Sequence, residues 1–129
     1  LDIRSYVAEL QRKKPVIWCG DMNVIHRDND IYDIRKREKQ ACLTPEERGN
    51  FGDHLRTLNL IDSYRHLHPN DIGWSYFSRR NVGAQEKGQG WRLDYILVSE
   101  ALKHNIGRAW MREDVMGSDH HPCLIELNL

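Results

Sequence analysis

Apolar residues recur at helical spacing over residues 1–13, which predicts an amphipathic helix at the start of the chain. Two lysines and then a proline follow, a combination that is typical of a helix end. The residues expected to share one face of this helix are Ile3, Tyr6 or Val7, and Leu10.

A second helix is predicted to begin at "TPEE". Thr44 suits the N-cap and Pro45 the first helical position, and Glu47 completes a capping box three residues after the threonine. Three later apolar residues have the spacing of one buried helix face, and these are Phe51, Leu55 and Leu58.

Three apolar stretches predict strands, at residues 16–19, 93–99 and 121–129. Alternate residues of the last stretch suit one buried face: Cys123, Ile125, Leu127 and Leu129. Residues 25–43 are polar and aperiodic, and they exceed the ~12–15 residues of an ordinary connection, so we expect a functional loop there. Because helices and strands are mixed, the fold class is α/β or α+β.

The 129 residues have the composition of one small globular domain, with 40% hydrophobic and 29% charged residues. Nineteen basic residues balance nineteen acidic ones, so nucleic-acid binding would have to come from a local patch. The three cysteines lack CxxC spacing, which argues for a reducing compartment. Without an apolar run of ~20 residues or a signal-peptide pattern, we expect an intracellular protein, in the nucleus, the cytoplasm or an organelle, with no membrane partner.

Polar groups lie at the ends of the predicted strands at three places: Asp21 and Asn23 in "GDMN", Asp94 in "WRLDY", and Ser118, Asp119 and His120 in "GSDH". Each aspartate alone is compatible with a turn cap. Together they suggest a site, because strand ends cluster at one sheet edge in layered α/β folds. Asp21 and Asn23, two residues apart on a strand, are expected to point the same way. Carboxylates suit a hard cation, a histidine suits a phosphate and an amide can donate to an oxyanion, so the set predicts phosphoryl chemistry.

A zinc site is an alternative, because cysteine and histidine are the usual zinc ligands. No pair in this sequence has metal-finger spacing, which disfavours zinc. The residues available to such a site are Cys19, His26, His120, His121 and Cys123.

Five stretches resemble the exonuclease III-type apurinic/apyrimidinic endonucleases of the DNase I-like endonuclease/exonuclease/phosphatase superfamily, in the order of that family: "PVIWCGDMNV", "TPEERGNF", "DSYRHLHP", "GWRLDYILVS" and "GSDHHP". The likeness covers essentially the whole chain and corresponds to the C-terminal half of the family. GDxN and SDH would also fit other branches, including sphingomyelinases and inositol phosphatases, whereas "TPEERxxF" and "GWRLDY" point to the abasic-site enzymes.

The resemblance implies a role for each strand-end residue. Asp21 matches the aspartate that orients or deprotonates the attacking water or binds the metal, and Asn23 matches the asparagine that hydrogen-bonds the scissile phosphate. Asp94 matches the aspartate bonded to the catalytic histidine, and His120 matches that histidine. The implied catalytic residues are Asp21, Asn23, Asp94 and His120, and the implied ligands of Mg²⁺, with Mn²⁺ as a substitute, are Asp21, Asn23 and Asp119.

Substrate binding is implied for five further residues: Trp91, Leu93, Trp74, Arg37 and Gln40. Trp91 and Leu93 match a wall of the pocket for a flipped-out abasic sugar, with a place in the core as the alternative. Trp74 lies where the family has an aromatic pair, although Gly73 occupies the first position of that pair. Arg37 and Gln40 stand where the family sets asparagines against the phosphates, with a solvated loop as the alternative.

The family fold is a four-layer α/β sandwich, and residues 1–129 would form about its C-terminal half, a single partial domain of one sheet with flanking helices. A half-sandwich leaves one sheet face uncovered. We therefore expect the chain to be stable with the missing N-terminal half or through self-association.

The implied function is that of a Mg²⁺-dependent DNA repair nuclease that cuts double-stranded DNA 5′ to an abasic site, with 3′-phosphodiesterase or exonuclease activity besides. Two alternatives stay open. One is a non-catalytic fragment that acts as a DNA-binding or assembly module. The other is a different phosphodiesterase of the superfamily, acting on lipids or inositol phosphates, which the "GWRLDY" match disfavours.

Overall fold

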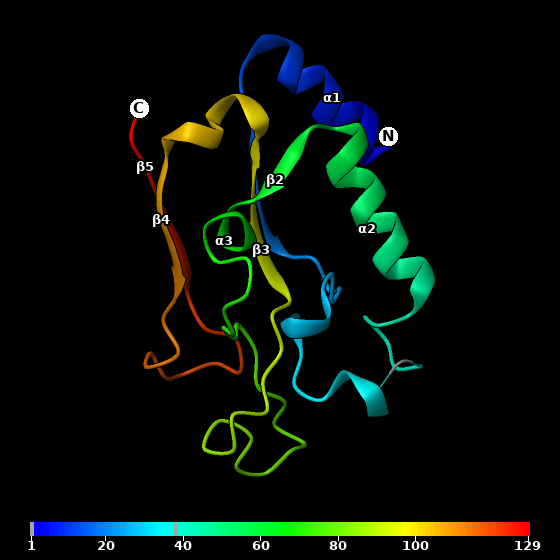
Figure 1. The fold of residues 1–129 in the computed structure, drawn as a ribbon, viewed down its shortest axis with the longest axis vertical. Helices are drawn as coiled ribbons and strands as arrows, with labels where there is room; N and C mark the ends of the chain where they lie inside the picture. The colour runs from blue at the N-terminus through cyan, green and yellow to red at the C-terminus, as the bar shows by residue number, and fades with distance from the viewer. Residues whose placement is uncertain (1, 38) are drawn as a thin grey trace.

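The computed structural model describes residues 2–37 and 39–129, in which helices and strands are mixed along the chain (Figure 1). The helices are α1 (Ile3–Lys13), α2 (Pro45–Thr57) and α3 (Ser63–Leu67), and the 3-10 helices are η1 (Asp28–Asp30), η2 (Ile34–Lys36) and η3 (Glu100–Asn105). The strands are β1 (Ile17–Asp21), β2 (Leu60–Asp62), β3 (Asp94–Ser99), β4 (Ile106–Met111) and β5 (Cys123–Leu127). This mixture confirms the fold class expected from the sequence.

Local sequence signals account for the two long helices. Asp2 caps α1 by accepting a hydrogen bond from the backbone N–H of Arg4. The predicted capping box of α2 is confirmed, because Thr44 and Glu47 each accept a hydrogen bond from the other's backbone N–H. Strands β2 and β4 carry weaker signals, since β2 has three residues and β4 contains a glycine and an arginine.

Strand β3 is the centre of a three-stranded antiparallel sheet with the order β1-β3-β2. Strands β4 and β5 form a separate antiparallel pair. Figure 1 shows α1 and α2 on one side of the three-stranded sheet and the β4-β5 pair on the other, with α3 in contact with both β3 and β4. The register of β1 on β3 sets Asp21 opposite Asp94, which brings two predicted site residues to the same end of the sheet.

The main core lies between the long helices and the sheet. Val7 of α1 and Phe51 of α2 pack in one cluster with Tyr95 and Leu97 of β3. The predicted buried face of α2 is confirmed, because Leu55 and Leu58 pack with the same cluster.

Two apolar predictions are wrong in detail. In α1, Val7 is buried, so the Val7 alternative holds, whereas Ile3 is exposed because the helix touches the core along a narrow stripe. At the other end of the chain, Leu129 is 93% exposed, because β5 ends at Leu127 and does not carry its alternation further.

In the polar segment of residues 25–43, the described residues include apolar anchors. Ile25, Ile31 and Leu43 are buried and pack with Leu93. The backbone N–H of Ile25 donates to the carbonyl of Cys42 at 2.8 Å, which closes the loop at its base. A long loop with its ends fastened and its own core is a scaffold on which functional side chains can be held.

A buried ion-pair network fastens this loop to the sheet. The guanidinium of Arg92 donates to Asp30 (Nε to Oδ1, 2.7 Å) and to Asp62 (Nη1 to Oδ1, 3.0 Å). Arg65 also donates to Asp30 and, at 2.7 Å, to two backbone carbonyls. Removing one member would leave a buried charge uncompensated. The network therefore fixes the position of Arg92, two residues before Asp94.

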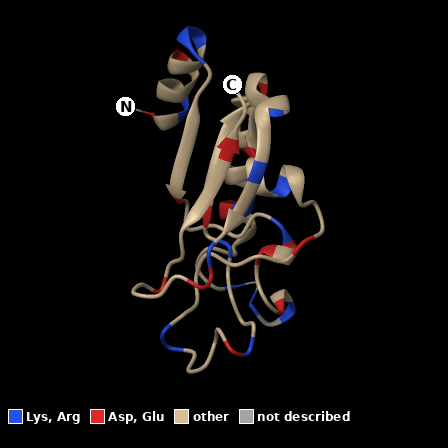
Figure 2. Cartoon of the chain, turned by 90° about the vertical axis from the view of Figure 1, so that its left-hand side faces the viewer, with Lys and Arg blue, Asp and Glu red and all other residues tan. Residues whose placement is uncertain are grey.

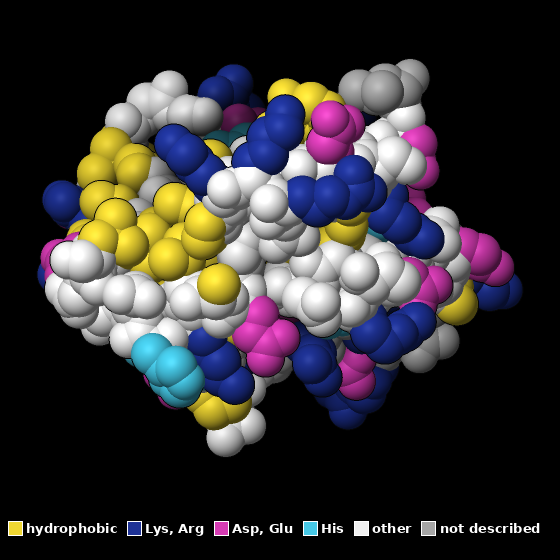
Figure 3. Space-filling model, turned by 90° about the horizontal axis from the view of Figure 1, so that it is seen from above, with side chains coloured by type: hydrophobic (Ala, Val, Ile, Leu, Met, Phe, Trp, Pro, Cys, Tyr) yellow, Lys and Arg dark blue, Asp and Glu magenta, His cyan; other side chains and the backbone are white. Residues whose placement is uncertain are grey.

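Strand β1 lies at an edge of the sheet and has one exposed side. Ile17, Cys19 and Asp21, which alternate along the strand, are all exposed. Figure 3 shows hydrophobic side chains exposed together on the face of the molecule seen from above. The exposed side of β1 agrees with the uncovered face expected of a half-sandwich, and the partner that would cover it remains a prediction.

Charged residues of both signs are spread over the loops and helices, whereas the strands carry few (Figure 2). This view shows no single basic face, in keeping with the balanced charge of the sequence. Over residues 2–37 and 39–129, no helix is both long and apolar enough to span a bilayer.

Candidate active site

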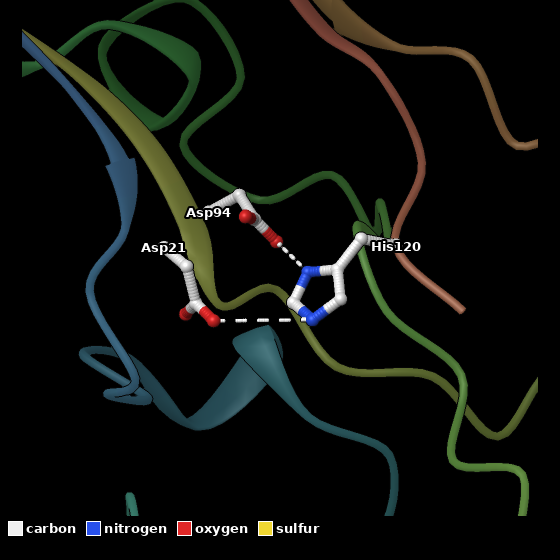
Figure 4. Close-up of side chains that lie close together, drawn as sticks. All are labelled: Asp21, Asp94 and His120. Atoms are coloured by element: carbon white, nitrogen blue, oxygen red, sulfur yellow. Dashed lines mark hydrogen bonds and ion pairs between the residues drawn. The ribbon is translucent and has the colours of Figure 1, made fainter. Parts of the chain in front are cut away.

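Asp21, Asp94 and His120 meet at one end of the three-stranded sheet (Figure 4). Nδ1 of His120 lies 2.8 Å from Oδ2 of Asp94, and Nε2 lies 3.8 Å from Oδ2 of Asp21. An ionised carboxylate can only accept a hydrogen bond, so this geometry puts the ring proton on Nδ1. The side chain of Asp94 is 18% exposed and that of Asp21 36%, so the histidine is held by the more buried carboxylate.

Three separate segments supply these side chains. Asp21 is the last residue of β1 and Asp94 the first of β3, so their proximity follows from the strand register. His120 comes from the loop that precedes β5, and its backbone N–H donates to Oγ of Ser118 at 3.1 Å. The tertiary structure thus brings together three of the predicted catalytic residues, which the sequence sets up to 99 positions apart.

The same three side chains could hold a metal ion. Each offers a ligand atom, and these atoms lie within 4.8 Å of one another. Two carboxylates and one imidazole suit a divalent cation that prefers oxygen ligands or accepts one nitrogen. Burial, with the charge of Asp94, raises the pKa of Cys123 to about 12, so this thiol stays protonated near neutral pH. Among the described residues, the group of converging ligand atoms contains no cysteine, so the zinc alternative gains no support from it.

Asn23 and Asp119 are placed differently from the expectation. Strand β1 ends at Asp21, and Asn23 has a left-handed backbone with φ of 49°, so the prediction that strand alternation orients Asn23 is wrong. The turn is held by Asp21, whose carboxylate accepts from the Asn23 backbone N–H at 2.9 Å. Asp119 lies outside the group of three ligands, and its Oδ2 is 3.9 Å from Nε of Arg79.

Three of the predicted substrate-binding residues line one hollow of about 680 Å³: Arg37, Gln40 and Trp91. The guanidinium of Arg37 lies over the ring of Tyr32, 4.1 Å from its centroid. Arg80 adds a second cation to the lining. The hollow therefore combines aromatic surface with positive charge, a combination that is common in binding sites for nucleic acids.

Tyr76 lies between Trp91, which lines this hollow, and His120, and sequence reasoning missed it. Its ring centroid lies 5.0 Å from that of His120 and 6.3 Å from that of Trp91. Its backbone forms isolated β-bridges with the same two residues. The aromatic run "WSYF" carried the signal, but alternation along the chain does not tell which of its rings faces the site.

Trp74 and Leu93 are buried in the structure, and their assignment to the substrate pocket stays a prediction. Trp74 is 7% exposed and packs with Phe77, and a Cβ on Gly90 would overlap its ring. Leu93 is 5% exposed and belongs to the core of the loop at residues 25–43. Neither residue lines the hollow that contains Arg37, Gln40 and Trp91.

Comparison with known families places the chain in a class. Residues 1–120 match the family described as the Endonuclease/Exonuclease/phosphatase family, and the chain belongs to that family. Two relatives of the chain are named as nucleases.

An exodeoxyribonuclease of Bacillus subtilis (strain 168) is 42% identical to this chain over 126 residues. A DNA-(apurinic or apyrimidinic site) endonuclease of Dictyostelium discoideum is 40% identical over 134 residues. The alignments cover 97% and 100% of this chain but only 49% and 36% of the two relatives. The chain therefore spans half or less of the length of these relatives.

Solved structures agree with these relatives. The AP endonuclease LMAP from Leishmania major superposes with a TM-score of 0.91 at 30% identity, over 98% of this chain and 42% of that one. An AP endonuclease from Archaeoglobus fulgidus superposes with a TM-score of 0.90 at 26% identity, over 98% of this chain and 51% of that one. The resemblance to abasic-site endonucleases and the DNase I-like fold of the chain, as part of such a structure, are thereby confirmed.

Proposed function

We propose that this chain is part of a DNA repair nuclease that hydrolyses the phosphodiester bond 5′ to an abasic site in double-stranded DNA. The observation that carries the proposal is the convergence of Asp21, Asp94 and His120 at one end of the sheet. The named relatives supply the substrate class. A 3′-phosphodiesterase or exonuclease activity at the same site, and an intracellular location where DNA is present, belong to the proposal.

His120 is the group that meets the phosphate. Asp94 holds Nδ1, so Nε2 is left to contact a phosphate oxygen, and the carboxylate stabilises the positive charge that the ring then carries. Asp21 takes a proton from the attacking water, which bonds to phosphorus as the bond to the leaving sugar oxygen breaks. The amide of Asn23 donates to the negative charge that develops on the phosphate.

The proposed cofactor is Mg²⁺, with Mn²⁺ as a substitute. Its assigned ligands are Asp21, Asn23 and Asp119, of which Asp21 has the strongest support because it belongs to the group of converging ligand atoms. When bound, the cation would polarise the phosphate and offset its charge.

The hollow beside Trp91 is the proposed contact region for DNA. Arg37 and Arg80 are positioned to contact backbone phosphates, which adds affinity without reading sequence. Trp91 and Tyr76 supply aromatic surface between the hollow and His120, where a flipped-out abasic sugar can be held.

Full activity, in this proposal, requires a second layer over the sheet, from additional chain or from a second copy. The relatives are at least twice as long as the aligned region, and Ile17 and Cys19 are exposed on β1. Light scattering on the purified chain tests this point. A stable, folded monomer would contradict it.

The proposed function is tested by incubating the chain with a duplex that carries one tetrahydrofuran abasic-site analogue, with and without Mg²⁺, beside an Asp21→Asn variant. Metal-dependent cleavage that the variant lacks supports the proposal, and absence of both cleavage and DNA binding overturns it. Binding without cleavage would assign the chain to the alternative of a non-catalytic DNA-binding fragment. Competition by phosphoinositide vesicles, and not by abasic DNA, would favour a lipid or inositol phosphodiesterase.

A further inference from the structure

We propose that Ser75 is a positioning residue for the pair formed by Asp94 and His120. Ser75 is fully buried, and sequence reasoning gave it no role. Its hydroxyl contacts the segment that carries Asp94, and its backbone contacts the segment that carries His120. The inference deepens the proposed function and rests on it, because it concerns the geometry of the same site.

The hydroxyl oxygen of Ser75 completes the hydrogen bonding at the start of β3. It accepts from the backbone N–H groups of Leu93 at 2.9 Å and of Asp94 at 3.0 Å. Strand β2 pairs with β3 only over residues 97–99, so it offers no partner to these two N–H groups. On the other edge the backbone N–H of Met22 donates to the Leu93 carbonyl, which makes Asp94 a non-hydrogen-bonded position opposite β1. The Asp94 N–H therefore faces Ser75 and depends on it.

The backbone of residues 75–76 contacts the segment that carries His120, the other member of the pair. The carbonyl of Ser75 accepts from the backbone N–H of His121 at 2.8 Å. Tyr76 bridges to Trp91 on one side and to His120 on the other. Residues 75–76 thus form a spacer between two segments that are 26 positions apart in sequence but carry side chains 2.8 Å apart.

Without the Ser75 hydroxyl, the buried N–H of Leu93 and the part-buried N–H of Asp94 lose their acceptor. Buried donors are costly when unpaired, so the start of β3 would shift until they found another partner. A shift of a fraction of an ångström at Asp94 is enough to weaken its alignment with Nδ1 of His120. Ser75 would then act on the chemistry through Asp94, without touching the substrate.

The state of the histidine ring gives a direct test. Long-range ¹H–¹⁵N spectra of the ¹⁵N-labelled full chain, near neutral pH, report which ring nitrogen carries the proton, and a His120→Gln variant assigns the signals. We expect the Nδ1-protonated form to dominate in the unsubstituted chain. In Ser75→Ala the ratio of Nδ1–H to Nε2–H should fall at least twofold, and Ser75→Thr, which keeps the hydroxyl, should preserve it.

Ser63→Ala is the matched control. Ser63 is also buried, and its hydroxyl donates to the Ile96 carbonyl of β3 at 2.6 Å, away from the pair. This variant should leave the His120 ratio unchanged. An unchanged ratio in Ser75→Ala, or an equal change in Ser63→Ala, overturns the proposal.

A variant that fails to fold is also covered. If Ser75→Ala does not fold, Ser75→Cys keeps the size of the side chain with a weaker acceptor, and it should show the same fall in the ratio. An unchanged ratio in Ser75→Cys would then overturn the proposal. The measurement needs no substrate, so failure of DNA cleavage alone would count against the proposed function and not against the role of Ser75.

Discussion

His120 and Asp94 are joined by a contact of 2.8 Å between Nδ1 and Oδ2, although η3, β4 and a loop lie between β3 and His120 along the chain. The contact decides which ring nitrogen is held by the protein. The other nitrogen, Nε2, points toward Asp21 and is the atom on which the proposed chemistry depends.

Replacing Asp94 by asparagine should abolish most of the nuclease activity. The amide can no longer fix the proton on Nδ1, and loss of the acid behind a catalytic histidine costs roughly 10²- to 10⁴-fold in rate. The loss is measured as the rate of cleavage of the abasic duplex, with the chain alone or together with the additional chain that activity requires. Asp114→Asn is the control, because Asp114 pairs with Arg112 at the surface, and equal losses in both variants would contradict the assignment.

Asp21→Asn should weaken metal binding more than Asp119→Asn does. Asp21 belongs to the converging ligands, whereas Asp119 lies near Arg79. We expect at least about tenfold weaker Mn²⁺ binding for Asp21→Asn, since loss of a ligand should cost no less than the ~10- to 100-fold of an outer-shell partner. Paramagnetic line broadening by Mn²⁺ measures both variants. A larger effect of Asp119→Asn would contradict this prediction and would make Asp119 the stronger ligand.

Tyr76→Ala should weaken binding of abasic duplex DNA. The ring lies between Trp91 and His120, and loss of an aromatic surface that stacks on nucleic acid costs ~1–3 kcal/mol. Tyr76→Phe keeps that surface and should bind like the unsubstituted chain. Fluorescence anisotropy with a labelled duplex measures both affinities, and unchanged binding in Tyr76→Ala would remove this residue from the DNA contact region.

Arg92→Met should be strongly destabilising. Burial alone would lower the pKa of Arg92, but Asp62 and Asp30 raise it above its ordinary value, so the group is a buried cation held by two carboxylates. Removing it leaves Asp62 without its guanidinium and Asp30 with Arg65 alone, and breaking a buried pair costs ~3–5 kcal/mol. Urea unfolding measures the loss. Arg112→Met, at an exposed pair, should leave the unfolding midpoint unchanged, and a comparable midpoint in both variants would show that the network contributes little.

The stability of the fold should decrease in acid because of Asp30. Burial would raise its pKa, but the charge and hydrogen bonds of Arg92 and Arg65 lower it below the ordinary value of 3.8. A carboxyl group whose pKa is lower in the folded chain stabilises it fully above about pH 4, and this contribution is lost as the pH falls through the folded pKa. Urea unfolding at decreasing pH should show this fall. Asp30→Asn should flatten it, and an identical pH dependence in that variant would assign the acid sensitivity to other carboxylates.

The sequence alone determined the local elements and the kind of chemistry. The capping box of Thr44 and Glu47 and the apolar spacing of α2 act within a few residues, so they could be recognised without the fold. The motifs around Asp21, Asp94 and His120 identified the family for the same reason, because residue type and spacing are written along the chain. The strand ends converge as those motifs implied.

Only the tertiary structure decided which side chains share the site. Strand register placed Asp21 opposite Asp94. A turn at Asn23 ended the strand alternation that would have oriented the Asn23 side chain. Among neighbouring aromatics, packing buried Trp74 and turned Tyr76 toward His120. Such choices depend on partners far away in sequence, since a side chain that fills the core and one that faces a ligand can have the same local pattern.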